Sequence, residues 1–192
     1  MFSNLNARAK AAQIRYKRWI VHNKRRNDCT EALVREGIRH GRKIILLLER
    51  LPHLRIMSYR LRDIEHAMLA GAFGDKEDRI TAKQSMDDGR LNLIIASRIF
   101  AKGIDIRVAD MVIDATALKS ANWVVQRLGR GTRLAEGKNG FIFISIQDVD
   151  FKHVNRQRRE ALAALKLPSV DVIWGIGAGN VYAKIMEKME SS

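Results

Sequence analysis

The sequence predicts a three-layer α/β fold, in which a parallel sheet is flanked by helices on both faces. A basic helical extension precedes this domain. Short apolar runs recur along the chain, and segments with helical spacing and capping residues separate them. The apolar fraction of 46% is enough for a real core, and 192 residues suit one domain plus an extension. Strands that alternate with helices imply right-handed crossovers, and therefore a parallel sheet with helices on both faces.

Residues 1–27 are expected to form a basic helical extension or interdomain linker. The chain has no acidic residue before Asp28. The basic residues before it are Arg8, Lys10, Arg15, Lys17, Arg18, Lys24, Arg25 and Arg26. Ile14, Trp19 and Ile20 recur at roughly helical spacing, which favours a basic amphipathic helix over a disordered tail. Such a helix could contact nucleic acid, a membrane surface or another domain, or could simply dock its few apolar residues.

Residues 28–192 are expected to form the α/β domain, with residues 150–192 as a C-terminal helical appendage. A first helix is predicted from Asn27 or Asp28, either of which is a good N-cap, to His40, with Gly41 ending it. The predicted strands are residues 43–49, 66–71, 91–97, 110–116 and 140–146. Further helices are predicted over residues 52–62, 75–88, 120–129 and 151–166, and the tail adds a strand and a final helix.

The formal net charge of +14 and the pI of about 10.4 favour an anionic partner such as nucleic acid or a phosphate-rich ligand. A basic surface that binds nothing is the simpler alternative. The single cysteine, Cys29, excludes an internal disulfide and a cysteine-based zinc site, and it suits a reducing, cytoplasmic setting. No apolar stretch reaches the ~20 residues of a transmembrane helix, and the N-terminus lacks the features of a signal peptide. We therefore expect a soluble, cytoplasmic protein.

The stretch QRLGRGTR, residues 126–133, places three arginines and a glutamine between a predicted helix and a predicted strand. Gln126 and Arg130 are four residues apart and share a helix face, while Arg133 follows Gly131, where the chain can bend back. These side chains can converge near the carboxyl edge of the sheet, which suits the binding of a transferring phosphoryl group. Cations that complement the dipole of a helix C-terminus, worth ~0.3–1 kcal/mol each, are an equally consistent alternative.

A second stretch, IIASRIFAKGIDI at residues 94–106, ends a strand in a small residue and a hydroxyl and then reaches a Gly-x-Asp turn. With QRLGRGTR it resembles motifs V and VI of the superfamily 2 helicases, whose usual forms are approximately A-[TS]-x5-G-[ILV]-D and Q-R-x-G-R-x-x-R. GRKIILLLERLPHL resembles motif IV, and LAGAFGDKEDR resembles the strand, glycine and helix start that follow it. The resemblance covers roughly residues 20–147 and implies a C-terminal, RecA-like domain.

The resemblance implies roles at an ATP site that is completed by a first RecA-like domain. Arg130 and Arg133 resemble the arginine fingers of this family, and Gln126 resembles the residue that orients the γ-phosphate or the attacking water. Gly103 is similar to the motif V glycine, whose freedom allows a tight turn. Asp105 is similar to the motif V aspartate near the nucleotide sugar.

The resemblance also implies contacts to the backbone of a nucleic acid. The candidate residues are Ser97, Arg98, Gly71, Arg79 and Lys102. A hydroxyl and main-chain donors bind phosphates without reading sequence. Lys102 departs from the family pattern, because many relatives carry an acidic residue just before the motif V glycine, and it should raise the local positive potential. We expect only a structural role for His53, as a neutral ring satisfied by one hydrogen bond.

Two parts of such a motor are not found in the sequence. TRLAEGKNG approaches the phosphate loop G-x-x-x-x-G-K-[ST], but its first glycine is misplaced and Asn139 replaces the hydroxyl. MVIDAT ends an apolar run in Asp114, but Ala115 follows where a catalytic glutamate is needed. We therefore assign no metal ligand and expect half an ATP site, with ATP and Mg held mainly by an N-terminal RecA-like domain in the same or a separate chain.

These observations predict the C-terminal motor domain of an ATP-dependent superfamily 2 DNA helicase or translocase of the branch-remodelling, recombination or repair type. The expected partner is nucleic acid, with DNA favoured over RNA, and no membrane is involved. By itself, this chain should be inactive as an enzyme. The alternative is a nucleic-acid-binding or regulatory module that kept the fold and lost the motor activity. An enzyme for small molecules is disfavoured because no G-x-G-x-x-G follows the first strand.

Overall fold

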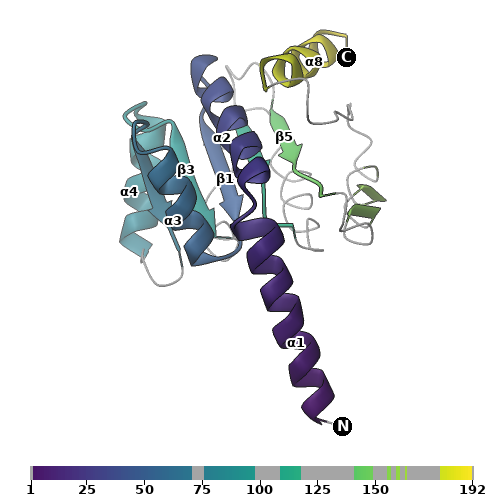
Figure 1. The fold of residues 1–192 in the computed structure, drawn as a ribbon. Helices are drawn as coiled ribbons and strands as arrows, with labels where there is room; N and C mark the ends of the chain where they lie inside the picture. Colours follow the sequence, from purple (N-terminus) through teal and green to yellow (C-terminus); the bar gives the residue numbers. More distant parts are fainter. Residues whose placement is uncertain are drawn as a thin grey trace.

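The computed structural model describes residues 2–70, 76–97, 109–117, 141–148 and 178–191, together with residues 155, 156, 159, 160 and 163. Within these residues, a 5-stranded sheet has the strand order β2-β3-β1-β4-β5 (Figure 1). The strands are β1 (Ile44–Leu48), β2 (His66–Leu69), β3 (Leu93–Ser97), β4 (Met111–Asp114) and β5 (Ile142–Ser145). Every pairing between them is parallel, which confirms the predicted fold class.

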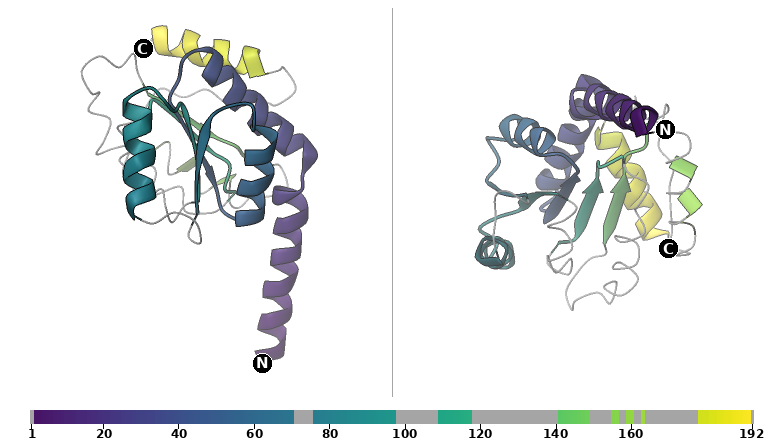
Figure 2. Two further views of the ribbon diagram at one scale, coloured as in Figure 1. Left: turned by 90° about the vertical axis from the view of Figure 1, so that its left-hand side faces the viewer. Right: turned by 90° about the horizontal axis from the view of Figure 1, so that it is seen from below.

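Helices cover both faces of this sheet. The described helices are α1 (Phe2–Tyr16), the π-helical turn η1 (Lys17–Val21), α2 (Lys24–Arg39), α3 (Leu51–Arg60), α4 (Lys76–Asp87) and α8 (Ala178–Glu190). Helices α2, α3 and α8 pack on one face and α4 packs on the other (Figure 2). The predicted helix at 120–129 and the predicted tail strand lie outside the described residues. None of the helices in the described ranges is long and apolar enough to cross a membrane.

The start of α2 differs from the prediction. Neither Asn27 nor Asp28 is the N-cap, because Asn23 takes this position and its side-chain oxygen accepts a hydrogen bond from the backbone N–H of Arg26 at 3.1 Å. Asn27 lies inside the helix, is buried, and donates its amide to the carbonyl oxygen of Val21 at 3.0 Å. The chain leaves η1 at Val21, so Asn23 is the first capping residue that it reaches.

The C-terminal half of α2 lies close to the sheet and ends at a glycine. Gly41 has a φ of +67°, a left-handed conformation that ends the helix where the sequence predicts. Gly37 lies at a close approach, where an added Cβ would come within 2.7 Å of Ile44 Cδ1 and 2.8 Å of Met111 Sδ. A small residue is therefore needed where α2 crosses β1 and β4.

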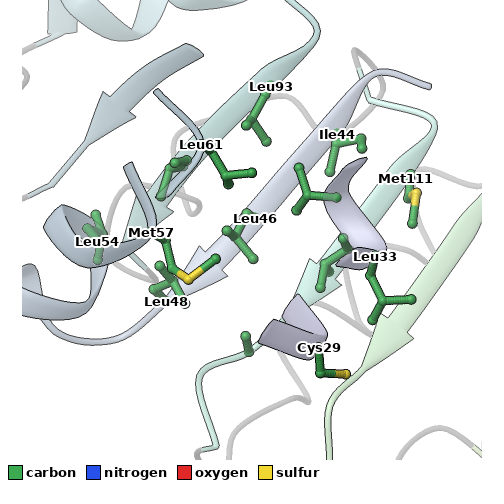
Figure 3. Packing of buried hydrophobic residues seen from close by; sticks show 14 of the residues in the cluster. Cys29, Leu33, Ile44, Leu46, Leu48, Leu54, Met57, Leu61, Leu93 and Met111 are labelled. Atoms are coloured by element: carbon green, nitrogen blue, oxygen red, sulfur yellow. The ribbon is translucent and has the colours of Figure 1, made fainter. Parts of the chain in front are cut away.

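Two apolar layers pack on the two faces of the sheet, because successive side chains of a strand point to opposite sides. Figure 3 shows part of the first layer, in which Ile44, Leu46 and Leu48 of β1 meet side chains of α2 and α3. The second layer contains Ile45 and Leu47 together with side chains of α4. Each β1 residue is at most 2% exposed, as the continuous apolar run predicts for a strand covered on both faces.

Helix α8 completes the first apolar layer. Val181 and Tyr182 are buried against it. The ring of Tyr182 stacks on His40 with 4.1 Å between ring centroids, and its hydroxyl accepts a hydrogen bond from Nε of Arg42 at 2.8 Å. The C-terminal helix is thus held by both apolar and polar contacts to the end of α2.

Candidate functional site

The parallel strands end side by side at one edge of the sheet, the carboxyl edge. The register pairs Leu48 of β1 with Ser97 of β3, and it pairs Leu47 of β1 with Asp114 of β4. Asp114 in turn pairs with Ser145 of β5. Ligands of open parallel sheets bind at this edge, where the loops leave the strands. The fold therefore gathers polar residues from three strands in the place where a ligand is expected.

Ser97, a predicted nucleic-acid contact, is the last residue of β3. It is 8% exposed, and its buried Oγ makes no hydrogen bond with any residue that the structure describes. Ser145 at the end of β5 also has a buried Oγ without a hydrogen-bond partner among the described residues. Because buried hydroxyls normally have a partner, an unpaired hydroxyl at the carboxyl edge is compatible with a contact made to a ligand.

Arg79, another predicted contact, lies in the first turn of α4 and is half-buried. Helix α4 connects β2 to the parallel strand β3, so it runs back across the sheet and its N-terminus lies toward the carboxyl edge. Arg79 and Ser97 thus belong to the same edge of the molecule.

The remaining candidates lie outside the described residues. They are Gly71, Arg98, Lys102, Gly103, Asp105, Gln126, Arg130 and Arg133. The stretch that contains Gly103 and Asp105 follows Ser97 directly, and the stretch that contains Gln126 follows the described residues after β4. The described strands that precede these two stretches, β3 and β4, end at the carboxyl edge.

Asp114, at the end of β4, has a structural role. Its Oδ1 accepts hydrogen bonds from the backbone N–H of Thr116 at 2.9 Å and from the Thr116 hydroxyl at 2.7 Å. This turn closes the strand, and the next residue, Ala117, has a φ of 53°, which is uncommon for a residue other than glycine. Within the described part of the chain, no group of three or more His, Cys, Asp or Glu side chains could hold a metal ion.

The structure adds Tyr16 and Arg50 to this edge. The Tyr16 hydroxyl donates a hydrogen bond to the carbonyl oxygen of Thr116 at 2.5 Å, and the Arg50 guanidinium carbon lies 5.9 Å from the centre of the Tyr16 ring. Burial raises the pKa of Tyr16, so the phenol stays protonated and keeps donating. The position of Arg50 just after β1 is a signal in the sequence, whereas nothing local indicates Tyr16.

A buried ion pair joins α2 to the segment after β5. Arg26 is 4% exposed, and its Nε donates to the two carboxylate oxygens of Asp148 at 2.9 and 3.1 Å. The two terminal nitrogens of Arg26 are buried and make no hydrogen bond within the described ranges. The Arg26 guanidinium is therefore a poorly solvated positive charge in the first turn of α2.

His53 lies near this charge and is fully buried. Its Nε2 is 2.8 Å from Oδ1 of Asn27. Burial, reinforced by the positive charges of Arg26 and His22, lowers the pKa of His53 to about 3. The ring is therefore neutral and donates to Asn27, which agrees with the structural role expected for it.

A known protein family accounts for this arrangement. The family described as "Helicase conserved C-terminal domain" matches residues 25–135, which is more than half of the chain. The chain belongs to this helicase family. The match includes Ser97, Arg79 and both stretches that resemble motifs V and VI. The predicted membership of superfamily 2 is thereby confirmed.

The curated relatives are longer than this helicase domain. The ATP-dependent RNA helicase DeaD of Klebsiella pneumoniae is 22% identical over 177 residues, which cover 91% of this chain and 27% of DeaD. The ATP-dependent RNA helicase DRS1 of Chaetomium globosum is 32% identical over 105 residues, which cover 53% of this chain and 13% of DRS1. The chain thus spans about a quarter or less of the length of these relatives.

Solved structures show the same fold. A variant of the Saccharomyces cerevisiae Dbp5 C-terminal domain, bound to Gle1 and IP6, has a TM-score of 0.60 at 16% identity and covers 86% of this chain and 94% of that one. The Escherichia coli DEAD-box protein SrmB, bound to RraA, has a TM-score of 0.56 at 20% identity and covers 69% of this chain and 78% of that one. These likenesses confirm the predicted RecA-like fold.

The expectation of DNA as the favoured partner is wrong, and the assignment to repair or recombination finds no support. The matched relatives DeaD, DBP8, ddx49 and DRS1 are all named as RNA helicases. The signals behind that expectation do not distinguish the two nucleic acids. Positive charge and backbone contacts act on phosphates, which DNA and RNA share.

Proposed function

We propose that this chain is the C-terminal motor domain of an ATP-dependent RNA helicase or translocase. The observation that carries the proposal is Ser97, which ends β3 at the carboxyl edge, at the start of the stretch that resembles motif V, with a buried hydroxyl that has no hydrogen-bond partner among the described residues. The family match over residues 25–135 supports the motor. The names of the matched relatives support RNA as the nucleic acid.

The proposed ATP site lies between this domain and an N-terminal RecA-like domain. Within the described residues, no group of three or more His, Cys, Asp or Glu side chains could hold a metal ion, and Asp114 accepts two hydrogen bonds from Thr116. ATP and its magnesium ion would therefore be held mainly by the N-terminal domain. Arg130 and Arg133 would reach the γ-phosphate as arginine fingers and stabilise the charge that spreads over its oxygens, while Gln126 orients the attacking water.

The remaining candidates divide between the nucleotide and RNA. Gly103 and Asp105 would lie near the nucleotide, where the glycine allows a tight turn of the backbone. The residues that would contact RNA phosphates are Ser97, Arg98, Gly71, Arg79 and Lys102. Such contacts position the strand without selecting its sequence. Closure on ATP and opening after hydrolysis would then move this domain along the bound strand.

The arginine fingers are tested in the protein combined with its N-terminal RecA-like domain. We expect Arg130→Ala or Arg133→Ala to lower kcat for RNA-stimulated ATP hydrolysis by ~10³ or more, the usual contribution of an arginine finger. Arg62→Ala, a substitution in the exposed turn after α3, is the matched control and should leave kcat unchanged. An effect of less than about threefold at both fingers would refute the assignment.

The isolated chain separates the motor domain from a binding module without motor activity. Alone, it should show no RNA-stimulated ATP turnover, because the sequence contains no phosphate loop. Added to the N-terminal domain, it should switch turnover on. If turnover stays unchanged on addition while RNA binding persists, the chain is a binding module instead. Turnover by the purified chain alone would also contradict the proposal.

A further inference from the structure

We infer that the exposed surface of α1 and η1 binds single-stranded RNA, in addition to the contacts at the carboxyl edge. This inference rests on the proposed function and adds a second site to it. We call the surface the N-terminal arm. It consists of Lys10, Ile14, Arg15, Lys17, Arg18 and Trp19.

The arm projects from the domain and is fixed at its base. Helix α1 extends away from the end of the sheet toward which β1 points (Figure 1). Residue 7 and residues 9–15 are all exposed, whereas Ile20 and Val21 are buried in the domain. The hydrogen bond from Tyr16 to Thr116 holds the junction. The arm is therefore presented on the same side as the carboxyl edge, with its direction set by packing.

The cations of the arm gather around one exposed apolar side chain. Lys10, Lys17 and Arg18 are four residues before, three after and four after Ile14, so they lie on neighbouring helical positions. Ile14 itself is 60% exposed. None of these three cations forms an ion pair with another described residue. The first acidic residue of the chain is Asp28, beyond the arm.

Several other cations on the described surface are neutralised by neighbouring carboxylates. Lys24 pairs with Asp28, Lys83 with Asp87 and Arg90 with Asp88, at 2.8 to 3.1 Å. The arm differs from these paired positions, because none of its cations forms an ion pair with a described residue. Charge complementarity points to a polyanion.

Trp19 adds a flat apolar surface next to these charges. Its side chain is 44% exposed, although the next residue, Ile20, is fully buried. The Arg18 guanidinium carbon lies 5.5 Å from the centre of the Trp19 ring, and Arg15 lies one turn earlier. Proteins that bind single strands combine cations that follow the backbone with aromatic rings on which bases stack. The arm offers both.

The arm has too little apolar surface for a protein partner or a membrane. Ile14 and Trp19 are its only large exposed apolar side chains among the described residues. A helix that docks on a protein needs a continuous apolar stripe, and a helix that lies in a membrane needs a broad apolar face. Single-stranded RNA matches the arm best, because its phosphates can contact the cations and a base can stack on the Trp19 ring.

The charge contacts are tested by titrating the full chain with a fluorescent oligouridine at several salt concentrations. The arm variant is Lys10→Gln/Lys17→Gln/Arg18→Gln. The control is Lys83→Gln/Arg90→Gln/Lys184→Gln, which removes the same charge elsewhere. Losing three phosphate contacts should weaken binding about tenfold or more and make the slope of log affinity against log salt shallower by about 2. The control should stay within about twofold, with an unchanged slope.

The stacking contact is tested with Trp19→Ala. Stacking on a ring releases no counterions, so we expect an affinity loss of about tenfold with an unchanged salt slope. Tyr59→Ala is the matched control, because Tyr59 is 68% exposed and lies under the Arg62 guanidinium at 4.5 Å. It should bind like the unmodified chain. Far-UV circular dichroism confirms that each variant is folded.

The outcomes separate this inference from the proposed function. If the arm variant binds RNA as tightly as its control does, or if the arm binds anionic lipid vesicles in preference to RNA, the inference is overturned. If Ser97→Ala weakens RNA binding while the arm variant does not, only the inference fails. If the unmodified chain binds no RNA at any salt concentration, the proposed function fails with it.

Discussion

The hydroxyl of Tyr16 donates a hydrogen bond of 2.5 Å to the carbonyl oxygen of Thr116, 100 positions along the chain. Tyr16→Phe removes this donor and leaves a buried carbonyl without it, so we expect the free energy of unfolding to fall by about 1 to 2 kcal/mol. Urea denaturation measures the change. Tyr59→Phe, at an exposed position, should stay within about 0.5 kcal/mol. If the two substitutions change the free energy of unfolding equally, the hydrogen bond from Tyr16 does not stabilise the fold.

The buried ring of His53 should make stability depend on pH. Its pKa in the folded protein is about 3, below the ordinary value of 6.5, so at intermediate pH the unfolded chain binds a proton that the folded protein excludes. Stability is therefore complete above about pH 6.5 and falls by up to ~1.4 kcal/mol per pH unit toward pH 3.

His53→Gln keeps an amide donor for Asn27 and removes the titrating group. We expect this variant to be less stable at neutral pH but to lose less stability between about pH 6.5 and pH 3. The matched control is Ile80→Gln, at a side chain that is 47% exposed and has no ionisable group. Denaturation at a series of pH values measures both. Parallel pH profiles for His53→Gln and the unmodified chain would contradict the assignment.

Removing one partner of the ion pair between Arg26 and Asp148 should lower the stability of the fold far more than replacing both partners by apolar residues. Asp148→Asn leaves a buried guanidinium without its counter-charge, and we expect it to cost about 3 to 5 kcal/mol of stability. The double variant Arg26→Met/Asp148→Leu should recover much of that loss, because no charge is left buried. Asp88→Asn, which breaks an exposed pair with Arg90, should cost about 1 kcal/mol or less. A single variant no worse than the double one would contradict this account.

The thiol of Cys29 should be unreactive in the folded protein. It is 8% exposed, and burial raises the pKa of its thiol to about 12, so almost no thiolate is present near neutral pH. We expect iodoacetamide at about pH 8 to label the native chain very slowly and the urea-unfolded chain rapidly. Mass spectrometry measures the extent of labelling. Equal labelling rates would show that the thiol is accessible in the native state.

The strands could be predicted from the sequence because both faces of a parallel strand are buried. IILLL in β1 and LIIAS in β3 are continuous apolar runs for this reason. The start of α2 could not be predicted, since Asn23, Asn27 and Asp28 are all good caps. The buried end of η1, a tertiary feature, decides between them.

The site could be predicted only where its residues carry a local pattern. Ser97 was found from the stretch that follows it. Tyr16 and Arg26 were missed because their partners lie 100 and 122 positions away, and no sequence window contains both ends. RNA could not be told from DNA, because the recognisable residues face phosphates that both polymers carry.

Helix α8 has a practical consequence for anyone who produces this domain. The family match ends at residue 135, yet Val181 and Tyr182 fill the same apolar layer as Leu33 and Met111. A truncation at the end of the family match would remove both strand β5 and the α8 side chains that cover this layer, and would expose the layer to water. Such a shortened fragment should precipitate or be degraded, whereas one that extends through Glu190 retains both elements. Expression boundaries for this domain should therefore follow its packing rather than its motifs.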